Sequence, residues 1–394
     1  MRHQAHPDER ARQTRTRNTQ PAIHNRLRIP LSTGAHDTTP NSGGNSATDQ
    51  SDDGNSTADT GFWSNRRVLV TGAAGFTGRH VVAALLDAGA QVTAVVRPNG
   101  STASFDEQVQ QLAVDIRDPD ACEQLLQTSA PNIDTIFHVA AVFRTVGVSR
   151  EELFESHVTA TENLIHSASR SGLRRFLHVS TIGVQGPNPP ANASEEAAAN
   201  PADDYQITKY QGEQAALKLG AEVDVPVTVV RPCAIYGAGD DRFLKIIRPI
   251  SRKRFTMIGT GNGRFHLVHV KDLAHGMLQA AKSQGAIGEI ITLGGEEIPT
   301  LREFVEMIAS KTGGGTLPIK VPYQLVYAAG YVCEKLCRLI NVEPPLHRRR
   351  VKFFGSDRSF DLTRARELAE YQPQVTLAQG VGGLVDWHKQ RGDI

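Results

Sequence analysis

The chain has 394 residues, enough for one large domain or two ordinary domains with a sizeable core. Its 43 Lys and Arg nearly balance its 42 Asp and Glu, so net charge indicates neither a nucleic-acid partner nor an anionic membrane. The 4 cysteines and 14 histidines lack metal-ligand spacing, which favours reduced thiols, a cytoplasmic location and no metal site. No apolar run reaches the roughly 18 residues of a transmembrane helix.

Residues 1–62 are predicted to be a disordered tail. The segment 36–61 is rich in Gly, Ser, Thr, Asn and Asp and contains almost nothing to bury. The first residues are Arg-rich, as in a transit peptide, but they show no apolar face. We therefore expect a tail without a targeting role, or a start codon assigned too far upstream.

Residues 63–236 alternate between short β-branched runs and longer stretches with apolar residues at helical spacing. The expected strands are 66–72, 91–97, 133–141, 174–181 and 225–232. The expected helices are 78–90, 118–130, 151–172 and one that begins near 203. Such alternation predicts an α/β fold, a doubly wound parallel sheet of the Rossmann type with helices on both faces.

Residues 237–394 lose this alternation and are predicted to form a smaller, mainly substrate-binding region. Helices are expected at 264–282, at 300–314 and, with an amphipathic pattern, at 323–340. We expect the last of these to pack the small region; the alternatives are a wall of an apolar pocket or a shallow membrane contact. The basic run 347–350 is interpreted as a solvated face, with an anion contact as the alternative.

A glycine-rich loop joins the first expected strand to the first helix. Gly72, Gly75 and Gly78 follow one another at three-residue intervals in "TGAAGFTG". Glycine suits such a turn because a Cβ would collide with a pyrophosphate lying on the backbone, and the helix start, with Phe76 and Thr77, offers unpaired N–H groups. The loop predicts a dinucleotide site.

The T-G-x-x-G-x-x-G spacing resembles that of the short-chain dehydrogenase/reductase superfamily. Together with the chain length, it is similar to the extended branch, the NAD-dependent epimerase/dehydratase and 3β-hydroxysteroid dehydrogenase-like proteins. The resemblance runs from about Arg66 to the C-terminus. It implies a Rossmann fold, an NAD- or NADP-dependent oxidoreductase and a possible homodimer.

The cofactor's adenosine is expected at the end of the second strand. An acidic residue at this position binds the ribose hydroxyl of NAD, whereas an Arg accommodates the 2′-phosphate of NADP. The chain has Arg97 there and no neighbouring carboxylate, which favours NADP over NAD. The resemblance further implies that the following residues line the cofactor: Asp115, Ile116, Val139, Ala140, Ala141 and Pro232.

The stretch "DDYQITKYQGE" places Tyr205 and Lys209 four residues apart on one helix face. A phenol is a poor acid or base at neutral pH until a nearby ammonium group lowers its pKa. By the resemblance, Tyr205 exchanges a proton with the substrate oxygen, Thr181 holds that oxygen, and Lys209 tunes Tyr205 and binds the nicotinamide ribose. Ser180 is the competitor of Thr181.

Three other positions bear on this assignment. Gln185 stands where relatives carry Tyr, which leaves the register of the Thr181 segment less firmly fixed. Asn163 has two interpretations, a family Asn near the active site or an ordinary helix-surface residue. His269 is expected to be structural.

Departures from the family patterns narrow the choice among dehydratase, epimerase and reductase reactions. Ile182 and Gly183 replace the acidic pair that follows Thr in sugar-nucleotide dehydratases, and Ala234 replaces the Asn that epimerases use to hold a nucleotide sugar. Arg264 lies one place before the position where epimerases carry an Arg for the diphosphate. Residues 343–381 resemble the C-terminal segment of 3β-hydroxysteroid dehydrogenase-like reductases.

The sequence therefore predicts an NAD(P)-dependent oxidoreductase that interconverts a secondary alcohol and a ketone on a small, fairly apolar substrate. One alternative is a nucleotide-sugar epimerase with tightly bound NAD. The other is a non-catalytic dinucleotide-binding sensor, although such proteins usually lose the Tyr or the Lys.

Overall fold

The computed structural model describes residues 60–98, 100, 105–143, 147–339, 342, 351 and 355–394. The predicted disordered tail and the basic run 347–350 lie outside these residues, except for the last three tail positions. Thr60 begins helix α1 (Thr60–Trp63), so the tail prediction is wrong for residues 60–62. Phe62 and Trp63 explain the helix, because Trp63 is fully buried and Phe62 packs edge-on against it.

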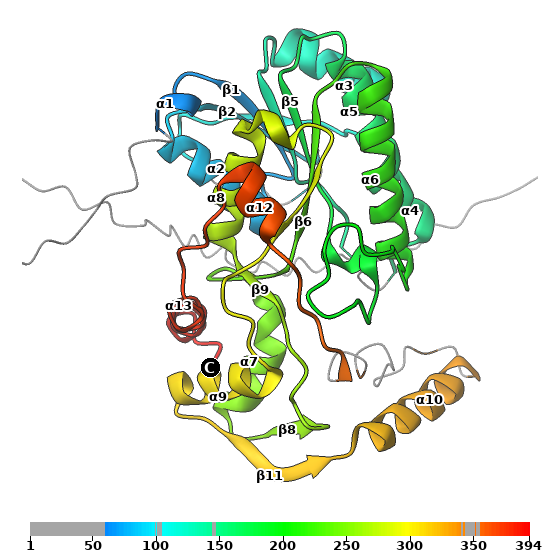
Figure 1. The fold of residues 1–394 in the computed structure, drawn as a ribbon, viewed down its shortest axis with the longest axis vertical. Helices are drawn as coiled ribbons and strands as arrows, with labels where there is room; N and C mark the ends of the chain where they lie inside the picture. The colour runs from blue at the N-terminus through cyan, green and yellow to red at the C-terminus, as the bar shows by residue number, and fades with distance from the viewer. Residues whose placement is uncertain are drawn as a thin grey trace, which may run out of the picture. The chain divides into compact units, whose positions relative to one another are not determined.

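A seven-stranded parallel sheet forms the centre of the fold (Figure 1). Its strand order is β10-β6-β5-β4-β1-β2-β3. The strands are β1 (Arg67–Thr71), β2 (Gln91–Val96), β3 (Gln110–Ala113), β4 (Thr135–His138), β5 (Arg175–Val179), β6 (Val227–Pro232) and β10 (Ile290–Leu293). The doubly wound α/β prediction is confirmed. Both edge strands, β3 and β10, were missed from sequence.

Helices cover both faces of this sheet (Figure 1). One face is packed by α2 (Phe76–Asp87), α8 (Val270–Lys282) and α12 (Thr363–Ala369). The other is packed by α3 (Pro119–Gln124), α5 (Ala160–Ala168) and α6 (Asp204–Glu222). The shorter helical elements are α4 (Arg150–Phe154), η1 (Leu125–Ser129), η2 (Glu155–Thr159), η3 (Ile182–Gln185), η4 (Asp241–Phe243) and η5 (Gln284–Ala286).

A separate apolar core lies among the elements that follow β6. Its residues come mainly from β7 (Ala234–Tyr236), α7 (Leu244–Ser251), β8 (Phe255–Ile258), β9 (Leu267–His269), α9 (Leu301–Thr312) and α13 (Leu377–Gln390). After α9 the chain continues with β11 (Thr316–Val321), which pairs with β8, and α10 (Tyr323–Leu339). The helix expected at 264–282 begins only at Val270, because Leu267–His269 pair with β7 as a strand. His269 then caps α8, accepting from the Lys271 N–H at 3.4 Å.

The domain division at residue 236 stays a prediction. The chain nevertheless crosses that boundary repeatedly, since α8, β10 and α12 come from residues beyond it and pack into the sheet layers.

Helix α10 presents an apolar stripe to solvent. Leu325, Val332 and Leu336 lie on one side of it and are 64%, 54% and 58% exposed. Among the described helices, none combines the length and the hydropathy needed to cross a bilayer.

A buried ion pair fixes α6 to the sheet. Arg231 on β6 donates two hydrogen bonds to the Glu213 carboxylate, at 2.9 and 2.6 Å, and both side chains are almost fully buried. Arg231 also donates to the backbone oxygen of Glu195, whose carboxylate accepts from the Thr292 N–H of β10. Two strands and one helix are thus tied together by charge-assisted hydrogen bonds.

Removing one charge of this pair should destabilise the protein strongly. We expect Glu213→Gln to lower the free energy of unfolding by about 3–5 kcal/mol, because Arg231 is left as an uncompensated buried cation. Urea denaturation measures this loss. The control is Glu222→Gln on the same helix, whose exposed pair with Lys218 should contribute no more than about 1 kcal/mol. Equal losses in the two variants would contradict the interpretation.

Candidate active site

One cavity of about 800 Å³ opens at the carboxyl ends of the parallel strands. This is the edge where open α/β sheets bind their ligands. Every residue predicted from the sequence to take part in catalysis or to line the cofactor borders this cavity, and so does Ser180; the weaker candidates Asn163 and Arg264 do not. The lining includes Gly72, Gly75, Phe76, Thr77, Gly78, Arg97, Asp115, Ile116, Val139, Ala140, Ala141, Thr181, Tyr205, Lys209 and Pro232.

The glycine loop leaves no room for side chains. Gly72 has φ +66°, and a Cβ there would lie 2.7 Å from the Ala140 backbone; one on Gly78 would lie 2.2 Å from the Gly72 oxygen. Gly75 precedes α2 without a side-chain cap, so the first N–H groups of that helix keep their donors for a ligand. The loop and helix start therefore fit the diphosphate of a dinucleotide.

The opposite end of the cavity carries two arginines. Arg97 directly follows β2, and Arg117 follows the Asp115 segment that was predicted to lie against adenine. Arg117 binds both Asp115 carboxylate oxygens, at 2.9 and 2.7 Å, and these hydrogen bonds lower the pKa of Asp115. Sequence reasoning overlooked Arg117, although it stands only two residues after Asp115.

Asn163 supports this end of the cavity from α5. Its side-chain amide donates to the backbone oxygens of Arg117 at 2.9 Å and Ile116 at 3.4 Å. These two hydrogen bonds hold the backbone of Ile116 and Arg117 in place, so Asn163 stabilises the conformation of this loop.

Thr181, Tyr205 and Lys209 approach the cavity from the end of β5 and the start of α6. Thr181 Oγ1 accepts from the Gly183 N–H at 3.1 Å, which leaves its hydroxyl hydrogen for another acceptor. Lys209 donates to the Val179 oxygen at 2.5 Å. The Ser180 hydroxyl is buried and has no hydrogen-bond partner among the described residues.

Burial dominates the electrostatics around Lys209. The side chain is 2% exposed, and loss of solvation lowers its pKa to about 8, while Glu213 partly raises it. Burial, and to a smaller extent the Lys209 charge, lowers the pKa of His138 and of His157 to about 3. A single ammonium group therefore stands among neutral imidazoles.

One part of the cavity lining mixes aromatic and cationic groups. Arg242 binds both oxygens of Asp240, at 2.8 and 2.7 Å, and its guanidinium lies 5.8 Å from the rings of Phe76 and Phe143. Arg358 lines the same space. Phe143, Arg242 and Arg358 were missed because they come from segments without a recognisable motif.

Arg264, considered as a diphosphate ligand, is engaged elsewhere. It forms two hydrogen bonds of 2.9 Å with Asp357 and is not part of the cavity lining.

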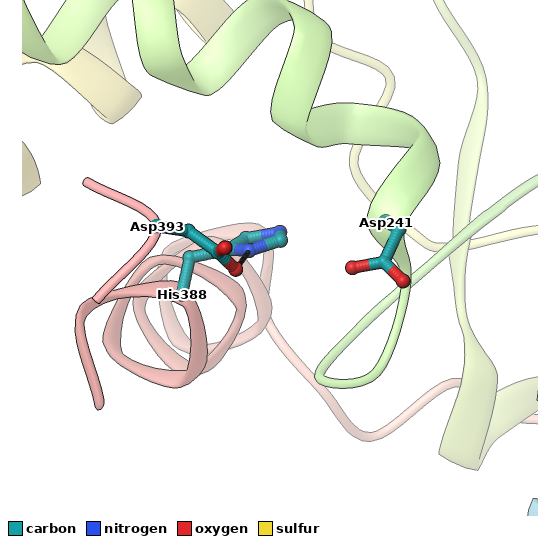
Figure 2. Close-up of side chains that lie close together, drawn as sticks. All are labelled: Asp241, His388 and Asp393. Carbon is teal, nitrogen blue, oxygen red and sulfur yellow. Dashed lines mark hydrogen bonds and ion pairs between the residues drawn. The ribbon is translucent and has the colours of Figure 1, made fainter. Parts of the chain in front are cut away.

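Among the described residues, one group brings three possible metal ligands together: Asp241, His388 and Asp393 (Figure 2). His388 bonds Asp393 at 2.9 Å. Arg391 reaches Asp241 at 2.7 Å and Asp393 at 3.4 Å. Because an arginine already balances both carboxylates, we interpret the cluster as an ion-pair network that holds the C-terminal residues against η4.

The buried amine of Lys209 predicts a pH-dependent stability. Its pKa is near 10.5 when unfolded and about 8 when folded, so between these values the unfolded chain binds more protons. The free energy of unfolding should therefore rise with pH across this window, by roughly 3 kcal/mol for this group alone.

Lys209→Met removes this titration. The difference between the parent protein and the variant should increase between pH 8 and 10.5, measured by urea denaturation at a series of pH values. Lys218→Met on the same helix is the control, because its exposed amine stays in water on folding. A flat difference for Lys209→Met would show that the amine is better solvated than the structure indicates.

Comparison with known proteins gives consistent matches. The family model described as the NAD dependent epimerase/dehydratase family matches residues 68–294. A ketoreductase of Stigmatella aurantiaca that acts on a farnesylated dihydroquinoline oxide is 30% identical over 325 residues, 81% of this chain and 95% of its own. A 3 beta-hydroxysteroid dehydrogenase/isomerase of Mycobacterium tuberculosis is 28% identical, over 80% of this chain and 88% of its own.

Among solved structures, the UDP-glucuronic acid 4-epimerase of Bacillus cereus in complex with NAD has the same fold. Its TM-score is 0.66 at 23% identity, over 82% of this chain and 99% of its own.

Proposed function

The chain belongs to the NAD-dependent epimerase/dehydratase family of oxidoreductases, and from this premise we propose that it interconverts a secondary alcohol and a ketone by direct hydride transfer. The observation that carries the proposal is the convergence of Tyr205, Lys209 and Thr181 on the same cavity as the glycine loop. A cofactor laid along that loop would reach these three side chains.

Each side chain has a defined role in this reaction. When bound, the nicotinamide cofactor gives up or accepts the hydride. In the reducing direction, Tyr205 donates its phenolic proton to the carbonyl oxygen as that oxygen gains negative charge, and Thr181 donates a hydrogen bond to the same oxygen. The positive charge of Lys209 stabilises the phenolate that remains, and solvent then returns the proton.

We propose NADP as the preferred cofactor. Among the residues that the structure describes, Arg97 forms no hydrogen bond or ion pair with a carboxylate. Its charge is therefore available to a 2′-phosphate. Asp115, a carboxylate of the cavity lining, is already held by Arg117. This pairing reduces its suitability as an acceptor for the ribose hydroxyl of NAD.

The proposed substrate is a fairly apolar ketone or alcohol. Two of the relatives are a ketoreductase and a hydroxysteroid dehydrogenase, and aromatic and aliphatic side chains such as Phe143, Ile182 and Ile235 line the cavity. A nucleotide-sugar epimerase is the alternative, and it would retain NAD through purification. The pairing of Arg264 with Asp357 weighs against it, since that cation is not directed at a sugar diphosphate. A homodimer remains a prediction.

Replacing the proposed acid should abolish turnover without emptying the cofactor site. We expect Tyr205→Phe to reduce kcat by about 10²–10⁴-fold, because the proton donor is lost, with NADPH affinity nearly unchanged. Reduction of apolar ketones by NADPH, together with fluorescence titration of NADPH, measures both quantities. Tyr210→Phe on the same helix is the control, since Tyr210 does not line the cavity. Parent-like turnover by Tyr205→Phe would refute the assignment.

Two substitutions at one position test the cofactor preference. Arg97→Ala should weaken NADPH binding by about tenfold or more, because a charge-assisted hydrogen bond is lost, and should leave NADH binding nearly constant. Arg97→Asp should in addition strengthen NADH binding, because the new carboxylate can accept from the ribose hydroxyl. If neither variant changes the NADPH to NADH ratio, Arg97 does not contact the adenosine end.

A further inference from the structure

His157 joins the two sides of the Tyr205 site. It lies in η2, is 1% exposed, and uses both ring nitrogens: Nδ1 is 2.9 Å from Thr208 Oγ1 and Nε2 is 3.0 Å from the Val142 oxygen. Thr208 belongs to α6, the helix that carries Tyr205, whereas Val142 belongs to the cavity wall. One buried imidazole therefore bridges the helix and the wall.

The hydrogen-bond partners fix the tautomer of His157. The Val142 carbonyl can only accept, so Nε2 must carry the hydrogen, and Nδ1 must then accept from the Thr208 hydroxyl. Burial holds the pKa of His157 down to about 3, which agrees with a neutral ring. Thr208 Oγ1 also lies 2.8 Å from the Asp204 oxygen, but its single hydrogen is assigned to the imidazole.

Tyr205 packs against both His157 and Phe143. Both rings meet the phenol edge-on, with centroids 5.4 Å away, at interplanar angles of 87° and 65°. Phe143 directly follows Val142, whose backbone is held at two points: its oxygen by His157 and its N–H by Ser156 Oγ at 3.2 Å. His157 thus contacts the Tyr205 ring directly. It also hydrogen-bonds Val142, the residue before Phe143, whose ring is the second to contact Tyr205.

The backbone around His157 is built for close contact with α6. The π-helical turn of η2 is a local geometry that is common at functional sites. Gly212 lets the two segments meet, because a Cβ there would lie 2.1 Å from the His157 oxygen. The imidazole is consequently held at a fixed distance from the helix turn that carries Tyr205 and Thr208.

We propose that His157 is a positioning residue that holds the Tyr205 phenol and the Val142–Phe143 wall in their reactive arrangement. It acts through Tyr205 and touches no reacting atom, so this role rests on the function proposed above. The physical reason is that hydride transfer with concerted proton donation requires the phenol at hydrogen-bond distance from the substrate oxygen, and displacement by about 1 Å can cost about 10²-fold in rate.

Three substitutions separate the two contacts of the ring. His157→Ala removes both and should lower kcat by about 10²-fold, with a smaller change in KM for NADPH. His157→Gln keeps an N–H near the Nε2 position for the Val142 oxygen, and His157→Asn keeps an acceptor near the Nδ1 position for Thr208. Each should recover part of the lost kcat. His166→Ala, an exposed histidine on the following helix, is the control and should behave as the parent protein.

The concentration of folded sites is set by the stoichiometry of NADPH binding, so that kcat refers to intact protein. Unchanged kcat in His157→Ala, or Gln and Asn variants no better than Ala, would overturn the proposal. Hydrogen exchange of the peptide containing Val142 gives a readout that does not depend on activity. It should be faster in His157→Ala and restored in His157→Gln; equal exchange in both would also overturn the proposal.

These readouts distinguish two failures. If Tyr205→Phe turns over like the parent protein, the proposed function fails whatever the exchange data show. If Tyr205→Phe is inactive but His157→Ala retains full kcat, only the positioning role fails.

Discussion

The buried ammonium group of Lys209 is the constraint on which the site depends. A cation removed from water is costly unless nearby groups stabilise it, and here the Val179 oxygen and the Glu213 charge do so. Glu213 is itself held by Arg231, so the chain of charges extends from the cavity into the sheet. The histidines around Lys209 stay neutral, which avoids placing a second cation beside the first.

Two parts of the cavity differ in the groups that shape them. At the glycine loop, recognition depends on absent side chains, because backbone must approach backbone at Gly72 and Gly78. Elsewhere in the cavity, Phe143 and Arg242 form a wall whose charge is already balanced by Asp240. Under the proposed function, the first arrangement would hold the cofactor, and the second would select the substrate by shape and apolar contact.

Whether a feature of the site could be predicted from the sequence depends on how far apart along the chain its interacting residues lie. The glycine loop and the Tyr205–Lys209 spacing are local patterns, since one turn or one helix face sets the geometry, and the structure brings both to one cavity. His157 and Arg231 act through contacts with segments far along the chain, which no local period encodes. The edge strand β3 was missed for a related reason: "QQLA" has no β-branched run and depends on pairing with β2.

Strand β10 belongs to the central sheet but comes late in the sequence, which limits the design of chimeras between this chain and its relatives. Between β6 and β10 the polypeptide leaves the sheet, forms β7, α7, β8 and β9, and returns through α8. A chimera joined once near residue 236 would exchange the sheet strand β10 and two covering helices, α8 and α12, along with Arg242 and Arg358 of the cavity. Grafting a new specificity therefore requires junctions on both sides of the segment from α8 to β10, so that the host keeps its own edge strand.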